Sequence, residues 1–375
     1  FALMAMPLFI LTGEIMNRGG ITRALIDLSM ALVGRLRGGL GHVNIMTSVF
    51  FAGISGSAVA DAAALSNTLV PEMRAQGYTN AYASAITAAS SIIGPIIPPS
   101  IILIFYGALM GTSVTALFLA GILPGLLLAA ALFLVNAFYA WRDDHPKMSR
   151  EEAPRLLPTL RRSAPALLLP LIIVGGIVFG LATPTEAAGV AVFAALAAGT
   201  FYGGISRQGL VDSLRRTATL SGSIFMLITA VAALGHLGAL ERLPEAIAAT
   251  VTDLGLGPLE YLIVLNVIFL LAGMVLDIPV ALALLVPLLA PVALAQGADP
   301  VHLGIVLCFN LCIGLVSPPL GGCLLVVSAV AQIDYWRLAR AVIPFVLVEV
   351  VVLAILVAFP EISLVLPRAF GLAGG

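Results

Sequence analysis

The hydrophobic pattern of this chain consists of long apolar runs separated by short polar and basic segments. Many of these runs are long enough to cross a hydrocarbon layer of about 30 Å at about 1.5 Å per helical residue. They cover residues 1–17, 80–110, 115–141, 163–181, 185–203, 217–236, 300–330 and 340–359. The pattern predicts an all-α polytopic membrane protein.

Two further apolar stretches, residues 40–71 and 259–291, are interrupted near their middle. The interruptions read GISGS at 53–57 and GMVLDIP at 273–279. Half-helices of about 12–15 residues would reach only about 18–22 Å, which is too short to cross the bilayer twice. Each stretch is therefore predicted to form a re-entrant helical hairpin whose tip lies at membrane depth.

A constant offset in residue number (314 − 94 = 220) relates the two hairpin regions without any gap. The offset pairs Gly53 with Gly273, Gly94 with Gly314, and Pro98-Pro99 with Pro318-Pro319. Each hairpin is followed by an apolar run that contains one of these Pro-Pro pairs, which predicts a broken helix. Duplicated halves with broken helices are the way in which secondary transporters build binding sites at the membrane midplane. The sequence thus predicts two repeats, each with a hairpin and a broken helix.

Charge placement predicts that the two repeats are inverted. Only 10% of the residues are charged, against roughly 25% in soluble domains. Arg35 and Arg37 precede the first hairpin and Arg74 follows it, so both ends of that hairpin are expected on the cytoplasmic side. Counting spans onward places the basic segment 142–162 on the same side, and the second hairpin then enters from the opposite side.

These features divide the chain into moving and static parts. Residues 38–114 and 258–335 are predicted to be two transport elements, while 1–37, 115–257 and 336–375 form a scaffold. Within the scaffold, the amphipathic segments 17–37 and 240–257 are interpreted as interfacial arms, with ordinary loop helices as the alternative. The chain starts inside an apolar run with no basic segment before it, so an upstream segment is also expected.

Small and hydroxyl residues at the helix breaks form a predicted Na⁺ site. Hard cations prefer oxygen ligands, and proline removes backbone donors, so the carbonyls near Gly94-Pro95 and Gly314-Leu315 are expected to be free. Close packing of membrane helices is the alternative role for small residues of this kind. The predicted Na⁺ ligands are Gly53, Ser57, Ser91, Gly94, Gly273, Asp277, Gly314 and Ser317.

A substrate carboxylate is predicted to bind at the same tips, because the N-terminus of a half-helix carries partial positive charge. Asp277 is an intramembrane carboxylate and therefore a functional candidate, although it could instead cap the following half-helix. Asp61 is a weaker candidate, and Glu186 is interpreted as part of an N-terminal capping box. The predicted substrate residues are Ser55, Gly56, Ser57, Pro98, Ser100, Asp277, Pro318 and Gly321.

Enzymatic functions have little support in the sequence. The GISG run at 53–56 matches the surroundings of an intramembrane serine protease nucleophile, but a base must lie within reach. The histidines, His42, His145, His236 and His302, fall near predicted span ends or in loops. Cys308, Cys312 and Cys323 are interpreted as packing residues. There is no phosphate-binding loop or dinucleotide fingerprint, so ATP-driven transport by this chain alone is unsupported. No organic cofactor and no nucleic-acid partner are expected.

Several motifs together resemble one known family. They are PLFILTGEIMNRGG at 7–20, SGSAVAD at 55–61, GPIIPPS at 94–100, TPTEA at 183–187, GMVLD at 273–277 and SPPLG at 317–321. Spread over essentially the whole chain, they are similar to the large membrane subunit of tripartite ATP-independent periplasmic (TRAP) transporters. Two positions depart from the family pattern, which often has Thr at Ser317 and at Ile278. The second departure removes one possible oxygen ligand.

This resemblance implies an elevator-type, Na⁺-coupled importer of organic acids in the bacterial inner membrane. It also implies a small membrane subunit and a periplasmic substrate-binding protein as partners, and a further span upstream of Phe1. A stand-alone ion-coupled anion carrier of related fold is the main alternative, and an intramembrane hydrolase is a remote one. Sialic acid, C4-dicarboxylates, keto acids and sugar acids all remain open as substrates.

Overall fold

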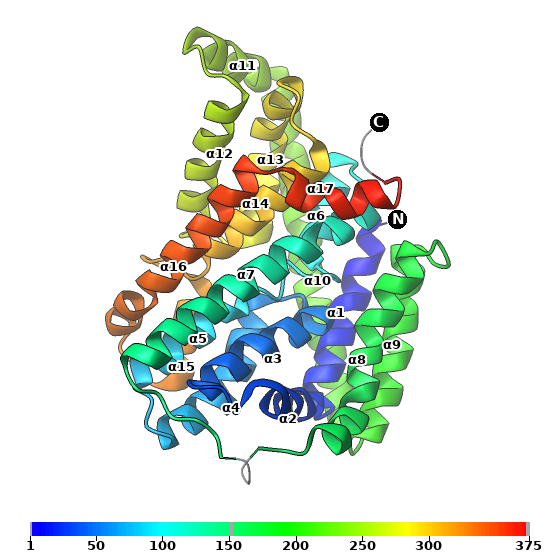
Figure 1. The fold of residues 1–375 in the computed structure, drawn as a ribbon. Coiled ribbons are helices and arrows are strands. Elements are labelled where there is room, and N and C mark those ends of the chain that lie inside the picture. The colour runs from blue at the N-terminus through cyan, green and yellow to red at the C-terminus, as the bar shows by residue number, and fades with distance from the viewer. Residues whose placement is uncertain (1, 150–152, 373–375) are drawn as a thin grey trace.

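The computed structural model describes residues 2–149 and 153–372, and within these ranges all regular structure is helical (Figure 1). The prediction of an all-α protein is confirmed. The first part of the chain, with its hairpin and broken helix, forms α1 (Ala2–Arg18), α2 (Ile21–Val33), α3 (Gly39–Ser55), α4 (Ala58–Ala75), α5 (Asn80–Ser91), α6 (Ile101–Met110) and α7 (Val114–Arg142). Two connecting helices follow, α8 (Leu156–Val178) and α9 (Pro184–Phe201).

The second part of the chain repeats this order of elements and ends with one additional helix. Its helices are α10 (Arg207–Leu240), α11 (Leu243–Asp253), α12 (Pro258–Gly273), α13 (Ile278–Ala295), α14 (Pro300–Gly314), α15 (Gly322–Ala331), α16 (Tyr335–Ala358) and α17 (Glu361–Ala369). The starts of α4 and α13 differ in number by the same offset (278 − 58 = 220), and so do the starts of α5 and α14 (300 − 80 = 220). The offset seen in the sequence therefore relates matching structural elements, and the predicted repeats are confirmed.

Hairpin 1 (α3 and α4) and hairpin 2 (α12 and α13) contain the predicted interruptions, but their arms are longer than expected. The arms have 16 to 18 residues. In hairpin 2 the first arm ends at Gly273, the first glycine of the interrupted segment, whereas in hairpin 1 the helix continues past Gly53 to Ser55. Gly53 is still helical, and the backbone turns at Gly56, whose φ of 58° is a left-handed conformation that favours glycine. Pro71 and Pro291 lie inside α4 and α13 without ending them.

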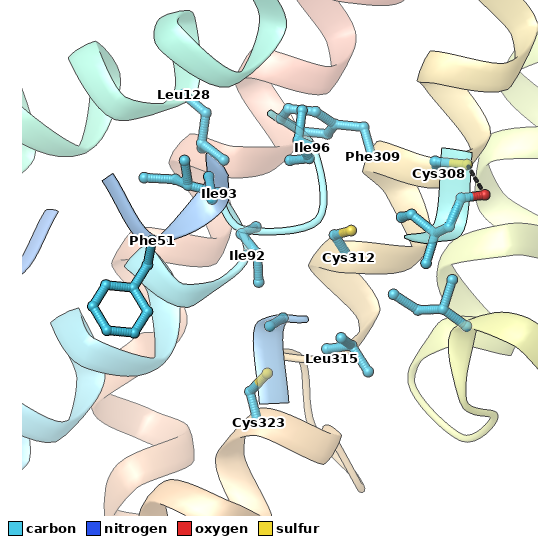
Figure 2. Packing of buried hydrophobic residues seen from close by; sticks show 14 of the residues in the cluster. Phe51, Ile92, Ile93, Ile96, Leu128, Cys308, Phe309, Cys312, Leu315 and Cys323 are labelled. Atoms are coloured by element: carbon cyan, nitrogen blue, oxygen red, sulfur yellow. Dashed lines mark hydrogen bonds between the residues drawn. The ribbon is translucent and has the colours of Figure 1, made fainter. Parts of the chain in front are cut away.

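The broken helices interlock the two repeats. Break 1 (residues 92–100) separates α5 from α6, and break 2 (residues 315–321) separates α14 from α15. The half after each break contacts the hairpin of the other repeat: α15 contacts α4, and α6 contacts α13. An apolar core joins the breaks, with Ile92, Ile93 and Ile96 on one side and Cys312, Leu315 and Cys323 on the other (Figure 2). All three cysteines are buried in this core, as their packing interpretation predicts.

The remaining helices border these interlocked elements. α1 contacts α9, α10, α3 and α6, and it lies between the α8–α9 pair and the hairpin helices (Figure 1). Among the described residues, five helices are long and apolar enough to cross a membrane, or up to six if the bent pair of α11 and α12 counts as one span. The two segments interpreted as arms contain α2 and α11. The division into transport elements and scaffold remains a prediction.

Candidate functional site

The tips of the two hairpins meet at one cavity of about 270 Å³, which we call the tip cavity. Hairpin 1 contributes Ser55, Gly56 and Ser57, and hairpin 2 contributes Asp277 and Pro279. Pro95 and Leu315 line it from the two breaks. The opposite wall comes from Gly13, Glu14 and Asn17 of α1 and from Arg216, Leu220 and Ile224 of α10. Two hairpins whose tips share one cavity fit a pair that enters from opposite sides.

Hairpin 1 turns through a compact set of hydrogen bonds at its tip. The Ser55 hydroxyl donates to Asp61 Oδ1 at 2.5 Å and accepts the Ser57 N–H at 3.1 Å. Ser57 is the N-cap of α4, and its hydroxyl accepts the Ala60 N–H at 3.4 Å. A Cβ atom at Gly56 would lie 3.0 Å from the Pro99 carbonyl oxygen, so glycine also permits the close approach of the tip to break 1. The N-terminus of α4 consequently faces the tip cavity.

Asp277 occupies the position on hairpin 2 that matches Ser57 on hairpin 1, because the repeat offset relates the two (277 − 57 = 220). It stands at the N-cap of α13 but makes no side-chain capping bond. Its side chain is exposed and lines the tip cavity. The capping bond that this alternative requires is therefore not formed, and the residue lines the tip cavity.

Asp61 is more central than the sequence suggested. It lies one helical turn after Ser57, is fully buried, and has one carboxylate oxygen, Oδ2, without a hydrogen-bond partner among the described residues. A Cβ atom placed at Gly94 would lie 2.4 Å from that oxygen, so Oδ2 points at break 1. A buried carboxylate oxygen without a partner is costly unless the group is neutral or meets a cation. The sequence marked Asp61 only as a carboxylate within an apolar run, and its approach to break 1 had no local signal.

The other predicted hydroxyl ligands donate to backbone carbonyls three to five residues earlier in the chain. Ser91 donates to the Ala88 carbonyl at 2.7 Å, and Ser317 donates to the Ile313 carbonyl at 2.8 Å. Ser100 caps α6 and donates to the Pro95 carbonyl. None of them lines the tip cavity, and neither do Pro98, Pro318 and Gly321.

The expectation of free carbonyls at the breaks is wrong for three of them. Pro95 O accepts the Ser100 hydroxyl, Gly314 O accepts the Ser317 N–H at 3.1 Å, and Leu315 O accepts the Cys323 N–H at 3.0 Å. The breaks fold into tight turns that satisfy these groups locally, although proline supplies no donor. A carbonyl has a second lone pair, but these three are not vacant acceptors.

The predicted glycine ligands serve close packing in this structure. A Cβ atom at Gly314 would lie 2.4 Å from the Gly273 carbonyl carbon, so the backbones of α14 and α12 touch there. A Cβ atom at Gly53 would lie 2.4 Å from the ring of Pro170 on α8. Tight glycine contacts of this kind let membrane helices approach closely, which was the alternative role of these residues. Their part in ion binding remains a prediction.

Two charged residues of the cavity wall were missed as site residues. Glu14 on α1 and Arg216 on α10 form an ion pair of 3.1 Å, and both line the tip cavity. In the sequence, Arg216 directly precedes the apolar run 217–236, where a basic residue is typical of the end of a span. The single acidic residue within the apolar segment 1–17 was the available signal for Glu14.

The remaining sequence predictions are resolved by local contacts. Glu186 forms the predicted capping box, in which its side chain accepts the Thr183 N–H at 2.8 Å. The Ser55 hydroxyl is bonded to Asp61, and no histidine is among the residues that line the tip cavity in the described part of the chain. A histidine-activated serine is therefore not formed here.

Comparison with known proteins gives a consistent result over the whole chain. The sequence profile of the family described as "Tripartite ATP-independent periplasmic transporter, DctM component" matches residues 1–362. The sialic acid TRAP transporter large permease protein SiaM of Vibrio cholerae is 41% identical over 99% of this chain and 87% of its own length. The C4-dicarboxylate TRAP transporter large permease protein DctM of Pseudomonas aeruginosa is 37% identical over 100% and 88%. The Alcanivorax borkumensis YdaH transporter matches with a TM-score of 0.66 at 16% identity over 95% of this chain and 85% of its own, which is a likeness of fold.

Proposed function

Because the chain belongs to the large-permease (DctM) family of TRAP transporters, we propose that it is the transport subunit of a Na⁺-coupled importer of organic acids. The relatives are named as transport permeases rather than enzymes, and this chain is accordingly a transport subunit and not an enzyme. SiaM and DctM are named for sialic acid and for C4-dicarboxylates. The shared chemistry of these two substrates is the carboxylate group.

The observation that carries the proposal is the meeting of two symmetry-related tips at one cavity. Ser57 and Asp277 occupy equivalent positions and both line it. The N-termini of α4 and α13 carry partial positive charge toward the tips, which favours an anionic substrate. A site built half from each repeat is the arrangement that alternating-access carriers use.

Na⁺ as the coupling ion is supported by oxygen atoms beside the tip. Asp61 Oδ2 has no hydrogen-bond partner among the described residues, is buried, and faces Gly94 in break 1. Hydroxyl and carboxylate oxygens suit a hard cation, and a cation here would neutralise a carboxylate that is otherwise costly to bury. Na⁺ would bind beside Asp61 and Gly94, with Ser57 and Asp277 contributing oxygen atoms from the neighbouring cavity wall.

The transport movement is proposed to be an elevator. The hairpins and broken helices form one interlocked unit, because α15 contacts α4 and α6 contacts α13. This unit would slide against a scaffold that includes α1, α8, α9 and α10. Cysteine pairs within the unit should crosslink without loss of uptake, whereas pairs that lock α1 to hairpin 1 should stop it. Uptake that survives both kinds of crosslink would contradict the moving unit.

The proposed partners are a small membrane subunit and a periplasmic substrate-binding protein, in the bacterial inner membrane. The proposal is tested by uptake of sialic acid and succinate into proteoliposomes that contain the chain and both partners. Uptake should require Na⁺ and the binding protein. Uptake that is unchanged in choline would contradict Na⁺ coupling, and uptake without the binding protein would favour the stand-alone carrier.

Two substitutions test the site itself. Ser57→Ala and Asp277→Ala should raise the Na⁺ concentration for half-maximal uptake by roughly tenfold or more, since a bond to a charged group contributes about 1.5–3 kcal/mol. Ser223→Ala is the matched control, because that hydroxyl donates only to the Thr219 carbonyl of its own helix. Equal Na⁺ dependence in all three variants would remove Ser57 and Asp277 from the site.

A further inference from the structure

Four charged side chains form a chain of ion pairs between α1 and α10, beside the tip cavity. Arg216 Nε lies 3.1 Å from Glu14 Oε1, and Arg18 Nε lies 3.9 Å from Glu14 Oε2. Arg18 also lies 3.6 Å from Asp212 Oδ2. Both acids and both arginines come from helices that border the hairpins, not from the hairpins themselves.

The two members that line the tip cavity differ in exposure and in pairing. The Glu14 side chain is 10% exposed and lies between two arginines, whereas the Arg216 side chain is 57% exposed and is paired only with Glu14 among the described residues. If Arg216 left this pair, Glu14 would still face Arg18, so its carboxylate would not be stranded. Arg216 can therefore change partner without leaving the Glu14 carboxylate unpaired, which lowers the free-energy cost of breaking this ion pair.

We propose that Arg216 is a carboxylate-binding residue on the scaffold side of the tip cavity. When no substrate is bound, the Glu14 carboxylate pairs with the Arg216 guanidinium in place of the substrate. The inference rests on the proposed function, because it names the group that receives the substrate acid. The guanidinium offers several N–H donors in a plane and binds a carboxylate through two parallel bonds. Its position in the same cavity as the two hairpin tips lets one small acid touch both sides.

The geometry gives a signature that a purely structural ion pair would not show. Glu14 competes with the substrate carboxylate for Arg216. Removing the Arg216 charge should therefore weaken the apparent affinity for substrate, whereas removing the Glu14 charge should strengthen it. Arg216→Gln should raise the KM for uptake by about tenfold, the equivalent of one lost charged bond. Glu14→Gln should lower the KM by a few-fold, because the competing carboxylate is gone. Arg216→Lys should lie between the wild type and Arg216→Gln, since it keeps the charge but loses the planar pair of donors.

The experiment measures KM and maximal rate in the proteoliposome assay with the complete transporter, using sialic acid and succinate as probes. Arg215→Gln is the matched control, since Arg215 is the exposed neighbour on the same helix and does not line the tip cavity. Its KM should equal that of the wild type, and the Na⁺ dependence of all variants should be unchanged. An unchanged Na⁺ dependence would show that Arg216 acts on substrate binding and not on ion binding.

The outcomes are distinct. Opposite shifts in KM for Arg216→Gln and Glu14→Gln support the inference, while shifts in the same direction, or none, overturn it and leave a structural ion pair. Should Arg216→Gln fail to fold, the direction of the Glu14→Gln shift decides alone. If the wild type takes up no organic acid in Na⁺, whether sialic acid, succinate, a keto acid or a sugar acid, the proposed function itself is contradicted and this inference falls with it.

Discussion

Gly94→Ala tests the proposed ion site through a single methyl group. In the structure, a Cβ atom at Gly94 would lie 2.4 Å from Asp61 Oδ2 and 3.2 Å from the Ser91 carbonyl oxygen. The first distance is about 1 Å shorter than an ordinary contact, so the carboxylate must move. It cannot rotate freely, because its other oxygen accepts the Ser55 hydroxyl at 2.5 Å. The added methyl therefore fills the space in which a cation would meet Oδ2.

The size of the effect follows from two terms. Overpacking of this kind costs about 1–3 kcal/mol of stability, and loss of one charged oxygen contact costs the bound ion about 1.5–3 kcal/mol. The second term corresponds to a rise of roughly 10- to 150-fold in the Na⁺ concentration for half-maximal uptake. Substrate KM at saturating Na⁺ should change far less, because Gly94 does not line the tip cavity.

The assay compares Na⁺ titrations of uptake, together with the rise in the thermal unfolding midpoint that Na⁺ causes in purified protein. Gly189→Ala on α9 is the matched control, since a Cβ atom there would meet nothing within 4 Å. Its Na⁺ dependence should equal that of the wild type. A folded Gly94→Ala protein with normal Na⁺ dependence would refute the assignment of Asp61 Oδ2 to the ion.

Three further predictions concern stability. Gly314→Ala should lower the thermal unfolding midpoint by an overpacking cost of about 1–3 kcal/mol, because its Cβ would lie 2.4 Å from the Gly273 backbone; a midpoint equal to that of Gly189→Ala would contradict the close contact. Glu349→Leu should raise the midpoint, since both carboxylate oxygens of this buried residue have no partner in the described part of the chain; loss of uptake in a protein of unchanged stability would instead show that the carboxyl has a function. Burial lowers the pKa of His145, in the segment after α7, below its ordinary value of 6.5. Its contribution to stability is therefore complete above pH 6.5 and is lost as the pH falls toward the lowered pKa, so His145→Gln should lose less thermal stability than the wild type between pH 7.5 and pH 5.5.

The sequence alone was sufficient for the elements and their duplication. Apolar runs of sufficient length can only be helical in a membrane, because backbone groups must be satisfied within each segment. Glycines and prolines that recur at one constant offset marked the breaks in both repeats. These are local properties of composition and spacing, and they were enough to place Ser57 and Asp277 at the tips.

The tertiary structure decided which polar atoms face one another. The approach of Asp61 to Gly94 joins α4 to break 1, and the pair of Glu14 and Arg216 joins segments from opposite halves of the sequence. Neither contact has a signal in local periodicity, because it depends on how α4 packs on break 1 and how α10 lies beside α1. Folding also brings the Cys323 N–H of α15 to the carbonyl of Leu315, which helix-breaking propensity alone cannot foresee. Propensity determines where a helix ends, whereas the neighbours brought there by folding determine what its free groups bind.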